Sequence, residues 1–366
     1  MPLVAHNGLP TFARLAREGE TILSPETALH QDIRELHIGL LNMMPDAALA
    51  ATERQFFRLV GACNQIVQFH VHPFTIPGLE RSQEALEYID RYYESFEKLK
   101  TDGLDALIIS GANVTRPQLP EESFWQPLTE VFDWAKSNVT STLCSCLASH
   151  ALMEYSHGIK RTHLGKKRWG VFSHRLLHRG HPLVNDLNTR FDVPHSRFNE
   201  IFRADIEAAG LEVLVESDPA GAHLWVSQDG FRVVYFQGHP EYDLISLLKE
   251  YKRETLRYIR GDLSEYPPFP ENYFDDDTKR LLNDYRQQII TARNKNLNAP
   301  EFPESVIIIK LDITWRDTAR ALISNWLGWV YQITHNDRRI PFMDRIDPDN
   351  PLGLDRPAPA RDPVIT

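Results

Sequence analysis

Two patterns of hydrophobic residues alternate along this chain. Short apolar runs are followed by longer stretches in which apolar residues recur every three or four positions, which is typical of strands alternating with helices. The predicted strands are residues 37–42, 65–73, 104–110, 139–144, 211–216, 224–227 and 232–236. The predicted helices are residues 48–59, 83–99, 125–136, 147–155, 242–259, 278–294 and 315–331. This alternation predicts an α/β fold with a doubly wound, mostly parallel sheet flanked by helices, and a site at the carboxyl ends of its strands.

The same pattern divides the chain into segments. Residues 1–34 mix proline, glycine and charge, and we interpret them as an N-terminal arm. Residues 35–345 form a single predicted α/β domain, with a polar surface excursion near 261–303. Repeated proline and aspartate over residues 346–366 predict a disordered tail.

Composition narrows the class of protein. A length of 366 residues with 42% hydrophobic content is enough for a substantial buried core. The net charge of -10 argues against nucleic-acid or anionic-membrane partners, although a local basic pocket is compatible with it. Three cysteines make no disulfide framework, and the first residues lack a basic region followed by an apolar stretch. We therefore expect a cytoplasmic protein.

Reactive side chains occur at two predicted strand ends. Residues 140–148 place Cys146 between a buried strand and a helix, and residues 233–241 bring His239 and Glu241 after another strand. A nucleophilic thiol needs a base and a group that orients the base, and these residues provide that set. Each also has an ordinary explanation: an inert cysteine, a structural histidine, a carboxylate in the first turn of a helix.

The turn at Cys146 resembles a nucleophile elbow, in which the amides of the following helix face an oxyanion and stabilise a thiolate. Cys144, two residues earlier on the strand, is expected to be a core residue, and Cys63 has no supporting partner. No second cysteine pair completes a common zinc-binding set, so we expect no metal.

Several segments in fixed order resemble the homoserine O-succinyltransferase and O-acetyltransferase family of methionine biosynthesis. The resemblance runs from about residue 37 to 332 and implies a fold like that of class I glutamine amidotransferases. The segments that carry it are Leu-Asn-Met-Met-Pro at 41–45, Ser-Gly-Ala at 110–112, Val-Thr-Ser-Thr-Leu at 139–143, Pro-His-Ser-Arg at 194–197, Gly-His-Pro-Glu-Tyr-Asp at 238–243 and Asn-Trp-Leu at 325–327.

By this resemblance, Cys146 carries the acyl group, His239 moves the proton and Glu241 orients His239. Backbone amides near Leu147 and Gly111 are expected to form the oxyanion hole. Three more residues fall where the family holds homoserine, and each is also explained by solvated charge or a turn: Lys167, Ser196 and Arg253.

Two positions depart from the family pattern. Asp46 and Ala47 stand where the family often has two lysines, so a contact to the acyl donor is missing or replaced. Thr115 stands where family members carry glycine for succinyl or glutamate for acetyl transfer. Thr115 is neutral and Arg116 beside it is a cation able to pair with a distal carboxylate, which favours succinyl.

The sequence thus predicts a homoserine O-succinyltransferase that binds no cofactor and uses an acyl-coenzyme A, succinyl or acetyl, as co-substrate. O-acetyl transfer and serine as acceptor remain alternatives. So do a glutamine amidotransferase domain and a non-catalytic binding protein of the same fold. Homoserine and acyl-coenzyme A are the expected small-molecule partners, and the oligomeric state is open, a homodimer included.

Overall fold

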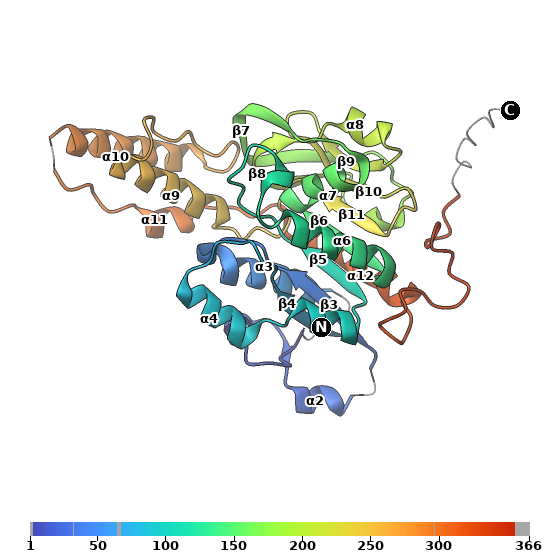
Figure 1. Ribbon diagram of the computed structural model, residues 1–366. Helices are drawn as coiled ribbons and strands as arrows, with labels where there is room; N and C mark the ends of the chain where they lie inside the picture. The colour runs from blue at the N-terminus through green and yellow to red at the C-terminus, as the bar shows by residue number, and fades with distance from the viewer. Residues whose placement is uncertain (1–2, 32, 64–66, 296, 356–366) are drawn as a thin grey trace.

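The computed structural model describes residues 3–31, 33–63, 67–295 and 297–355 (Figure 1). Its strands are β1 Leu3–Val4, β2 Ile22–Leu23, β3 Glu35–Leu41, β4 Gln68–Phe74, β5 Ala106–Ile109, β6 Ser141–Ser145, β7 Thr162–Leu176, β8 Arg190–Glu200, β9 Glu212–Ser217, β10 Gly221–Val226 and β11 Val233–Phe236. Its α-helices are α1 Pro10–Arg17, α2 Pro25–Leu29, α3 Leu49–Gly61, α4 Gln83–Tyr92, α5 Phe96–Asp102, α6 Trp125–Asn138, α7 Leu147–His157, α8 Arg203–Ala208, α9 Ser246–Arg260, α10 Asp276–Asn294, α11 Glu304–Ile308 and α12 Arg316–Ile333. Short 3-10 turns are η1 Asp46–Ala48, η2 Leu119–Glu121 and η3 Pro182–Val184.

All described strands belong to one sheet, in the order β2-β1-β4-β3-β5-β6-β11-β10-β9-β7-β8. The pairs from β2 to β11 are parallel, and those from β11 to β8 are antiparallel. The predicted α/β fold with a mostly parallel sheet is therefore confirmed. Strand β11 is parallel to β6 with Phe236 opposite Ser145, so the two strands that carry the reactive residues end side by side.

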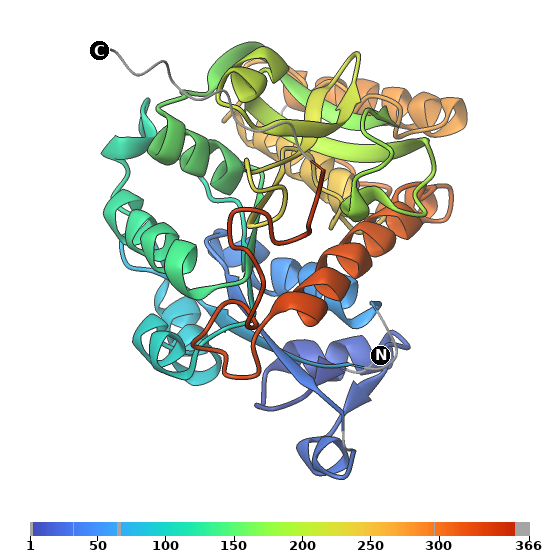
Figure 2. The same cartoon turned by 90° about the vertical axis from the view of Figure 1, so that its right-hand side faces the viewer.

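Helices cover both faces of the sheet, as a doubly wound fold requires. One core cluster packs α1, α3 and α12 against it, and another packs α5, α6 and α7. Helix α12 crosses the sheet diagonally in Figure 2. A third cluster joins α9, α10 and α11, which project to one side of the molecule in Figure 1, to Trp169 and Val171 of β7. Among the described helices, none combines the length and apolar character needed to cross a bilayer.

The segment expected as an N-terminal arm is part of the sheet. Leu3 of β1 pairs with Phe69 of β4, and Phe12 and Leu15 of α1 are buried in the core. Burial of these apolar side chains outweighs the local proline and glycine signals. The tail expected to be disordered makes turns up to residue 355, and Leu352 packs against the core. Its remainder lies outside the described residues.

Other boundaries differ for local reasons. The predicted helix 83–99 is two helices, because Ser95 accepts a hydrogen bond from the Lys98 amide at 3.2 Å and caps α5 while Glu94 bridges to Phe74 of β4. Helix α9 starts at Ser246, later than the predicted 242, because the preceding residues form a loop. Strands β7 and β8 were not predicted at all, since exposed charged residues such as Lys166 interrupt their alternation.

Glu53 of α3 links the N-terminal segment to the rest of the fold. Its buried carboxylate accepts hydrogen bonds from the hydroxyls of Thr11 (2.5 Å), Tyr88 (3.0 Å) and Tyr93 (2.6 Å). These donors belong to α1, α4 and the residue after α4. One side chain therefore holds three segments together.

Replacing Glu53 with alanine is expected to lower the free energy of unfolding by roughly 2 kcal/mol or more, because one buried and two partly buried hydroxyls lose their acceptor. Urea unfolding followed by circular dichroism measures this. The control is Asp90→Ala on the exposed face of α4, expected to change stability by less than about 0.5 kcal/mol. Equal effects of the two substitutions would show that the shared carboxylate contributes nothing specific.

Candidate active site

Cys146 lies at a sharp turn between β6 and α7. Its backbone has φ 53° and ψ -109°, a conformation that non-glycine residues rarely adopt. The Cys146 amide donates to the Phe236 carbonyl at 2.7 Å, and the Ser149 hydroxyl lies 2.9 Å from both the Cys144 and Phe236 carbonyls. These contacts fix the turn, and they leave the thiol partly accessible at the first turn of α7, where the helix dipole favours an anion.

The loop after β11 brings a histidine and a glutamate to this thiol. His239 Nδ1 lies 2.8 Å from Glu241 Oε1, and both side chains are buried, each residue 8% exposed. The His239 amide donates to the Pro194 carbonyl of β8 at 2.8 Å. Since Glu241 accepts a hydrogen bond from Nδ1, the other ring nitrogen is left for the Cys146 thiol, with which the imidazole forms a hydrogen bond.

The charges around His239 favour its protonated form. Burial alone lowers the pKa of an imidazole, but the charges of Cys146 and Glu241 and their hydrogen bonds raise the pKa of His239 well above its ordinary value. In contrast, burial raises the pKa of Cys63 to about 12 and also raises the pKa of Cys144, which is fully buried as predicted. Burial thus disfavours a thiolate at Cys63 and Cys144, whereas Cys146 has the imidazole of His239 as its hydrogen-bonding partner.

A half-buried carboxylate that the sequence analysis did not identify organises the neighbouring space. Glu250 of α9 accepts hydrogen bonds from Lys167 Nζ at 3.1 Å, from the Ser196 hydroxyl at 2.6 Å and from the Tyr242 hydroxyl at 2.7 Å. The Tyr242 ring stacks on His239, with 4.3 Å between centroids. Burial raises the pKa of a carboxyl, yet the cation of Lys167 and the hydroxyls of Ser196 and Tyr242 hold the pKa of Glu250 below its usual range. Two predicted substrate-binding residues therefore meet next to the imidazole.

Arg253, the third predicted substrate-binding residue, lies elsewhere. Its side chain is 61% exposed and its Nε contacts Glu254 at 3.2 Å. Together with Lys249, Lys252 and other residues it lines an open surface depression of about 390 Å³. The structure does not bring its guanidinium to the Glu250 cluster, although Arg253 follows Glu250 by one helical turn.

The predicted oxyanion residues are adjacent. A Cβ placed on Gly111 would lie 3.7 Å from the Cys146 Cβ and 3.9 Å from the Leu147 nitrogen. The Leu147 amide is the first in α7, so it has no acceptor one turn earlier within that helix. Gly111 thus lies beside the Cys146 Cβ and the first amide of α7.

The residues predicted to select the acyl group lie in a loop held by Glu122. This carboxylate accepts from the amides of Thr115 at 2.5 Å and Arg116 at 2.6 Å, and from the Thr115 hydroxyl at 3.2 Å. Both side chains are exposed. Arg161, which sequence reasoning missed, interacts electrostatically with Glu122 and Cys146, while burial lowers its pKa.

Two acidic residues brace the loops around the site. Asp46, at the position that departs from the family, accepts from Arg81 at 3.2 Å and from the Ser82 amide at 2.8 Å. It therefore anchors the start of α4. Asp243, in the loop that follows β11, pairs with Arg54 at 2.6 Å and with Arg58 of α3.

A strand-end thiol on a sharp turn, hydrogen-bonded to a histidine that a glutamate orients, places this protein in the class of α/β proteins equipped for acyl transfer through a cysteine. Comparison with known proteins gives the family. The family model described as homoserine O-succinyltransferase matches residues 2–336, so the chain belongs to the homoserine O-succinyltransferase family.

Full-length relatives agree with this assignment. Proteins named homoserine O-succinyltransferase from Methylobacter tundripaludum and Methylococcus capsulatus are each 68% identical over 354 residues, covering 97% of this chain and 100% of theirs. Among solved structures, a glutamine amido transferase from Methylobacillus flagellatus is 12% identical, covering 81% of this chain and 95% of that one, with a TM-score of 0.45. That likeness is too weak to place any residue.

Removing the charge of Glu241 is expected to lower the pKa of His239, because one of the two negative partners that favour the imidazolium is lost. In Glu241→Gln the imidazolium should therefore lose its proton at a lower pH than in the unchanged protein. NMR titration of the protein labelled with ¹⁵N in its histidines measures this. Glu254→Gln on the surface of α9 is the control, and an unchanged His239 titration in Glu241→Gln would contradict the assignment.

Proposed function

We propose that the protein is a homoserine O-succinyltransferase that forms O-succinylhomoserine, a reaction of methionine biosynthesis, from succinyl-coenzyme A and L-homoserine. One observation carries the chemistry: Cys146, His239 and Glu241 are aligned at the ends of two neighbouring parallel strands. The names of the full-length relatives support the substrates. A cytoplasmic location, as expected from the sequence, accords with this role.

In the first step the Cys146 thiolate attacks the thioester carbonyl carbon of the acyl-coenzyme A. The negative oxygen that develops is stabilised by the Leu147 amide and by backbone at Gly111, which lie against the thiol. The bond between carbonyl and coenzyme A sulfur then breaks, and His239 gives its proton to the departing sulfur. The acyl group remains on Cys146 as a thioester.

In the second step the homoserine hydroxyl attacks this thioester. His239, now neutral, takes the hydroxyl proton while Glu241 holds the imidazole through Nδ1 and stabilises its charged form. The new ester bond forms and the Cys146 thiolate leaves. Stacking of Tyr242 on the imidazole restricts the ring to this orientation.

We place the acceptor amino acid at the Glu250 cluster. Lys167 and Ser196 are already held there, next to the ring of Tyr242, and a carboxylate among them can accept from an ammonium group. Arg253 follows by three residues on α9 and is suited to the acceptor's carboxylate after leaving Glu254. We place the distal carboxylate of the succinyl group near Arg161, which interacts electrostatically with Cys146, and near Arg116.

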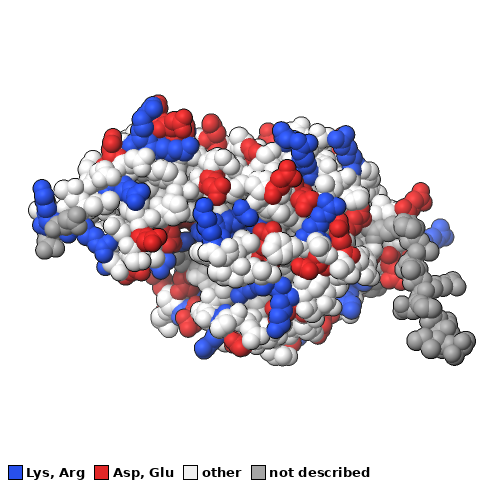
Figure 3. All heavy atoms as spheres, turned by 90° about the horizontal axis from the view of Figure 1, so that it is seen from above, with Lys and Arg blue, Asp and Glu red and all other residues white. Residues whose placement is uncertain are grey.

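The charges on the surface do not favour a highly charged macromolecular partner. On the face shown in Figure 3, acidic and basic side chains are interspersed, without an extended patch of either sign. This arrangement favours small-molecule substrates over a nucleic acid or an anionic membrane.

The proposal is tested by offering succinyl- and acetyl-coenzyme A separately with homoserine and with serine, and identifying the ester by mass spectrometry. We expect O-succinylhomoserine to form fastest. Cys146→Ala should abolish both product and acyl-enzyme, because no other described thiol is accessible. Glutamine hydrolysis without ester formation would instead favour an amidotransferase. Absence of both activities would favour a non-catalytic binding protein.

Thr115→Glu is expected to lower kcat/KM for succinyl-coenzyme A by about tenfold or more, with a smaller effect on acetyl-coenzyme A. The new carboxylate repels the distal carboxylate of the succinyl group, and like-charge contacts cost on the order of 1–2 kcal/mol at partly exposed sites. Steady-state kinetics with both donors measures the ratio. Thr115→Gln has the same size without charge, and an equal loss in that variant would assign the effect to crowding.

A further inference from the structure

Four histidines gather on one face of the sheet at β3 and β4. His37 of β3 pairs in register with His70 of β4, and His72 follows two residues later, so all three side chains leave the same face. His6, between β1 and α1, lies over them with its ring 4.6 Å from that of His72. None of the residues proposed to act on the acyl group belongs to this cluster.

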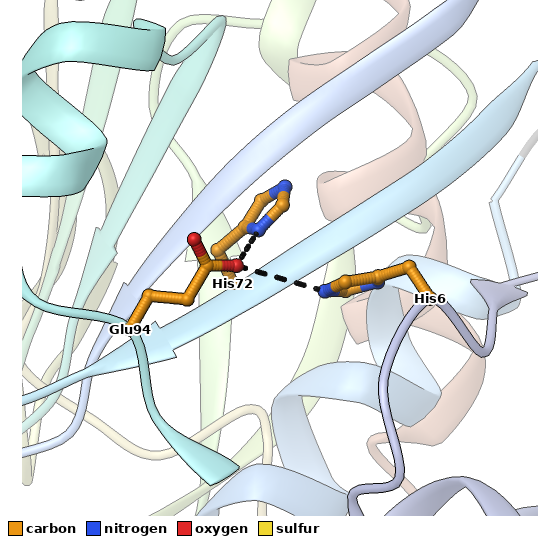
Figure 4. Close-up of side chains that lie close together, drawn as sticks. All are labelled: His6, His72 and Glu94. Atoms are coloured by element: carbon orange, nitrogen blue, oxygen red, sulfur yellow. Dashed lines mark hydrogen bonds and ion pairs between the residues drawn. The ribbon is translucent and has the colours of Figure 1, made fainter. Parts of the chain in front are cut away.

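Glu94 joins two of these rings. Its Oε1 lies 2.5 Å from His72 Nδ1 and 3.9 Å from His6 Nε2, and Figure 4 shows both rings directed at this oxygen. The three donor atoms are within 4.8 Å of one another. The Glu94 amide donates to the Pro73 carbonyl, which fixes the glutamate beside β4.

The hydrogen bonding of His6 determines which of its ring nitrogens is a donor. Nδ1 lies 3.2 Å from the Val4 carbonyl, which only accepts, so Nδ1 carries the hydrogen. Nε2 of the neutral ring therefore presents a lone pair, and this buried atom has no hydrogen-bond partner among the described residues. A lone pair thus faces a carboxylate oxygen.

A hydrogen is also missing from the row of contacts that links Glu94, His72, His37 and Glu35. Glu94 contacts His72 (2.5 Å), His72 Nε2 contacts His37 Nδ1 (2.8 Å), and His37 Nε2 contacts Glu35 (3.2 Å). Each of these three contacts needs one hydrogen. Two neutral imidazoles supply only two, whichever tautomers they adopt. One positive centre is missing from the network.

A metal ion supplies that centre, and we propose that His6 Nε2, His72 Nδ1 and Glu94 Oε1 bind a divalent transition-metal ion, of which Zn²⁺ fits the donor set best. Two imidazoles and a carboxylate are common zinc ligands, with water completing the coordination. With the ion on His72 Nδ1, the Nε2 hydrogen of His72 is donated to His37, and the Nε2 hydrogen of His37 is donated to Glu35. Every contact in the network is then satisfied, in the manner of outer-shell partners that orient metal ligands.

The charges nearby are compatible with this site. Lys98 pairs with the other oxygen of Glu94 at 2.8 Å, which leaves Oε1 for the ion. Arg338 acts on His37 and His70 from the other side and does not contact the proposed ligands in any described interaction. Because His6 precedes α1 while His72 and Glu94 belong to the centre of the fold, the ion would fasten the N-terminal segment to the sheet.

The test uses the full chain, stripped with a chelator and dialysed against Zn²⁺, with bound metal measured by mass spectrometry of the metal. We expect one equivalent that is lost in His6→Gln and in Glu94→Gln, and visible d–d bands when Co²⁺ replaces zinc. His37→Gln should weaken binding by about 10- to 100-fold, as outer-shell changes do. A rise in thermal midpoint on adding Zn²⁺ should disappear in His6→Gln.

His178→Gln is the matched control, since His178 also contacts a glutamate (Glu212, 3.4 Å) but at the surface. It should bind zinc as the unchanged protein does. Zinc held by Cys146 and His239 would persist in His6→Gln, so that result would overturn the proposal. So would loss in His70→Gln with retention in His6→Gln, which would move the site to Glu35, His37 and His70. Absence of bound zinc in the unchanged protein would also overturn the proposal, and the positive charge of the histidine network would then be a proton on one of its imidazoles.

Discussion

The reactive geometry depends on the backbone of Cys146. A non-glycine residue in the positive-φ region costs on the order of 1–3 kcal/mol, so the surrounding contacts must hold it there. They do so through the Phe236 carbonyl, which receives both the Cys146 amide and the Ser149 hydroxyl. Because Phe236 ends β11 three residues before His239, one peptide group sets both the shape of the thiol's turn and its spacing from the imidazole. The pair is thus positioned by the parallel sheet, and a change in the β6–β11 register would separate it.

The two halves of the sheet contribute different parts of the site. The parallel half supplies the thiol and the imidazole, whereas Lys167 and Ser196 come from the antiparallel strands β7 and β8. Glu250 of α9 joins the halves, because its carboxylate binds both of these residues and the tyrosine that covers the imidazole. A carboxylate that is largely withdrawn from water and yet ionised needs such partners, and here the partners also form the proposed acceptor site.

The sequence predicted most of the parallel half and the meeting of Cys146, His239 and Glu241, because buried strands and strand-end residues leave local signals. Cys146 and His239 lie in short segments whose hydrophobic pattern stops abruptly. Glu250 was missed since it stands in a basic amphipathic helix, where a carboxylate is expected to be solvated; only the fold shows that its side faces the imidazole. The same limit applies to Arg253, which the family resemblance indicated: local sequence does not show that its exposed guanidinium contacts Glu254 and not Glu250. Strands β7 and β8 escaped prediction because their charged residues serve the site and break the alternation.

Helix α12 has a consequence for how the chain is made. It covers the sheet through contacts with segments synthesised far earlier: Trp326 donates to Ser141 at 2.8 Å, and Arg34 binds the carbonyls of Tyr331 and Thr334 at 2.9 and 2.7 Å. A growing chain that has completed β6 already has α1 and α3 on this face, but the part that α12 covers stays open until residues 316–333 emerge. At synthesis rates of about 5–20 residues per second this interval lasts on the order of ten seconds or more. Throughout it, the nascent protein is a client for chaperones that bind exposed apolar surface.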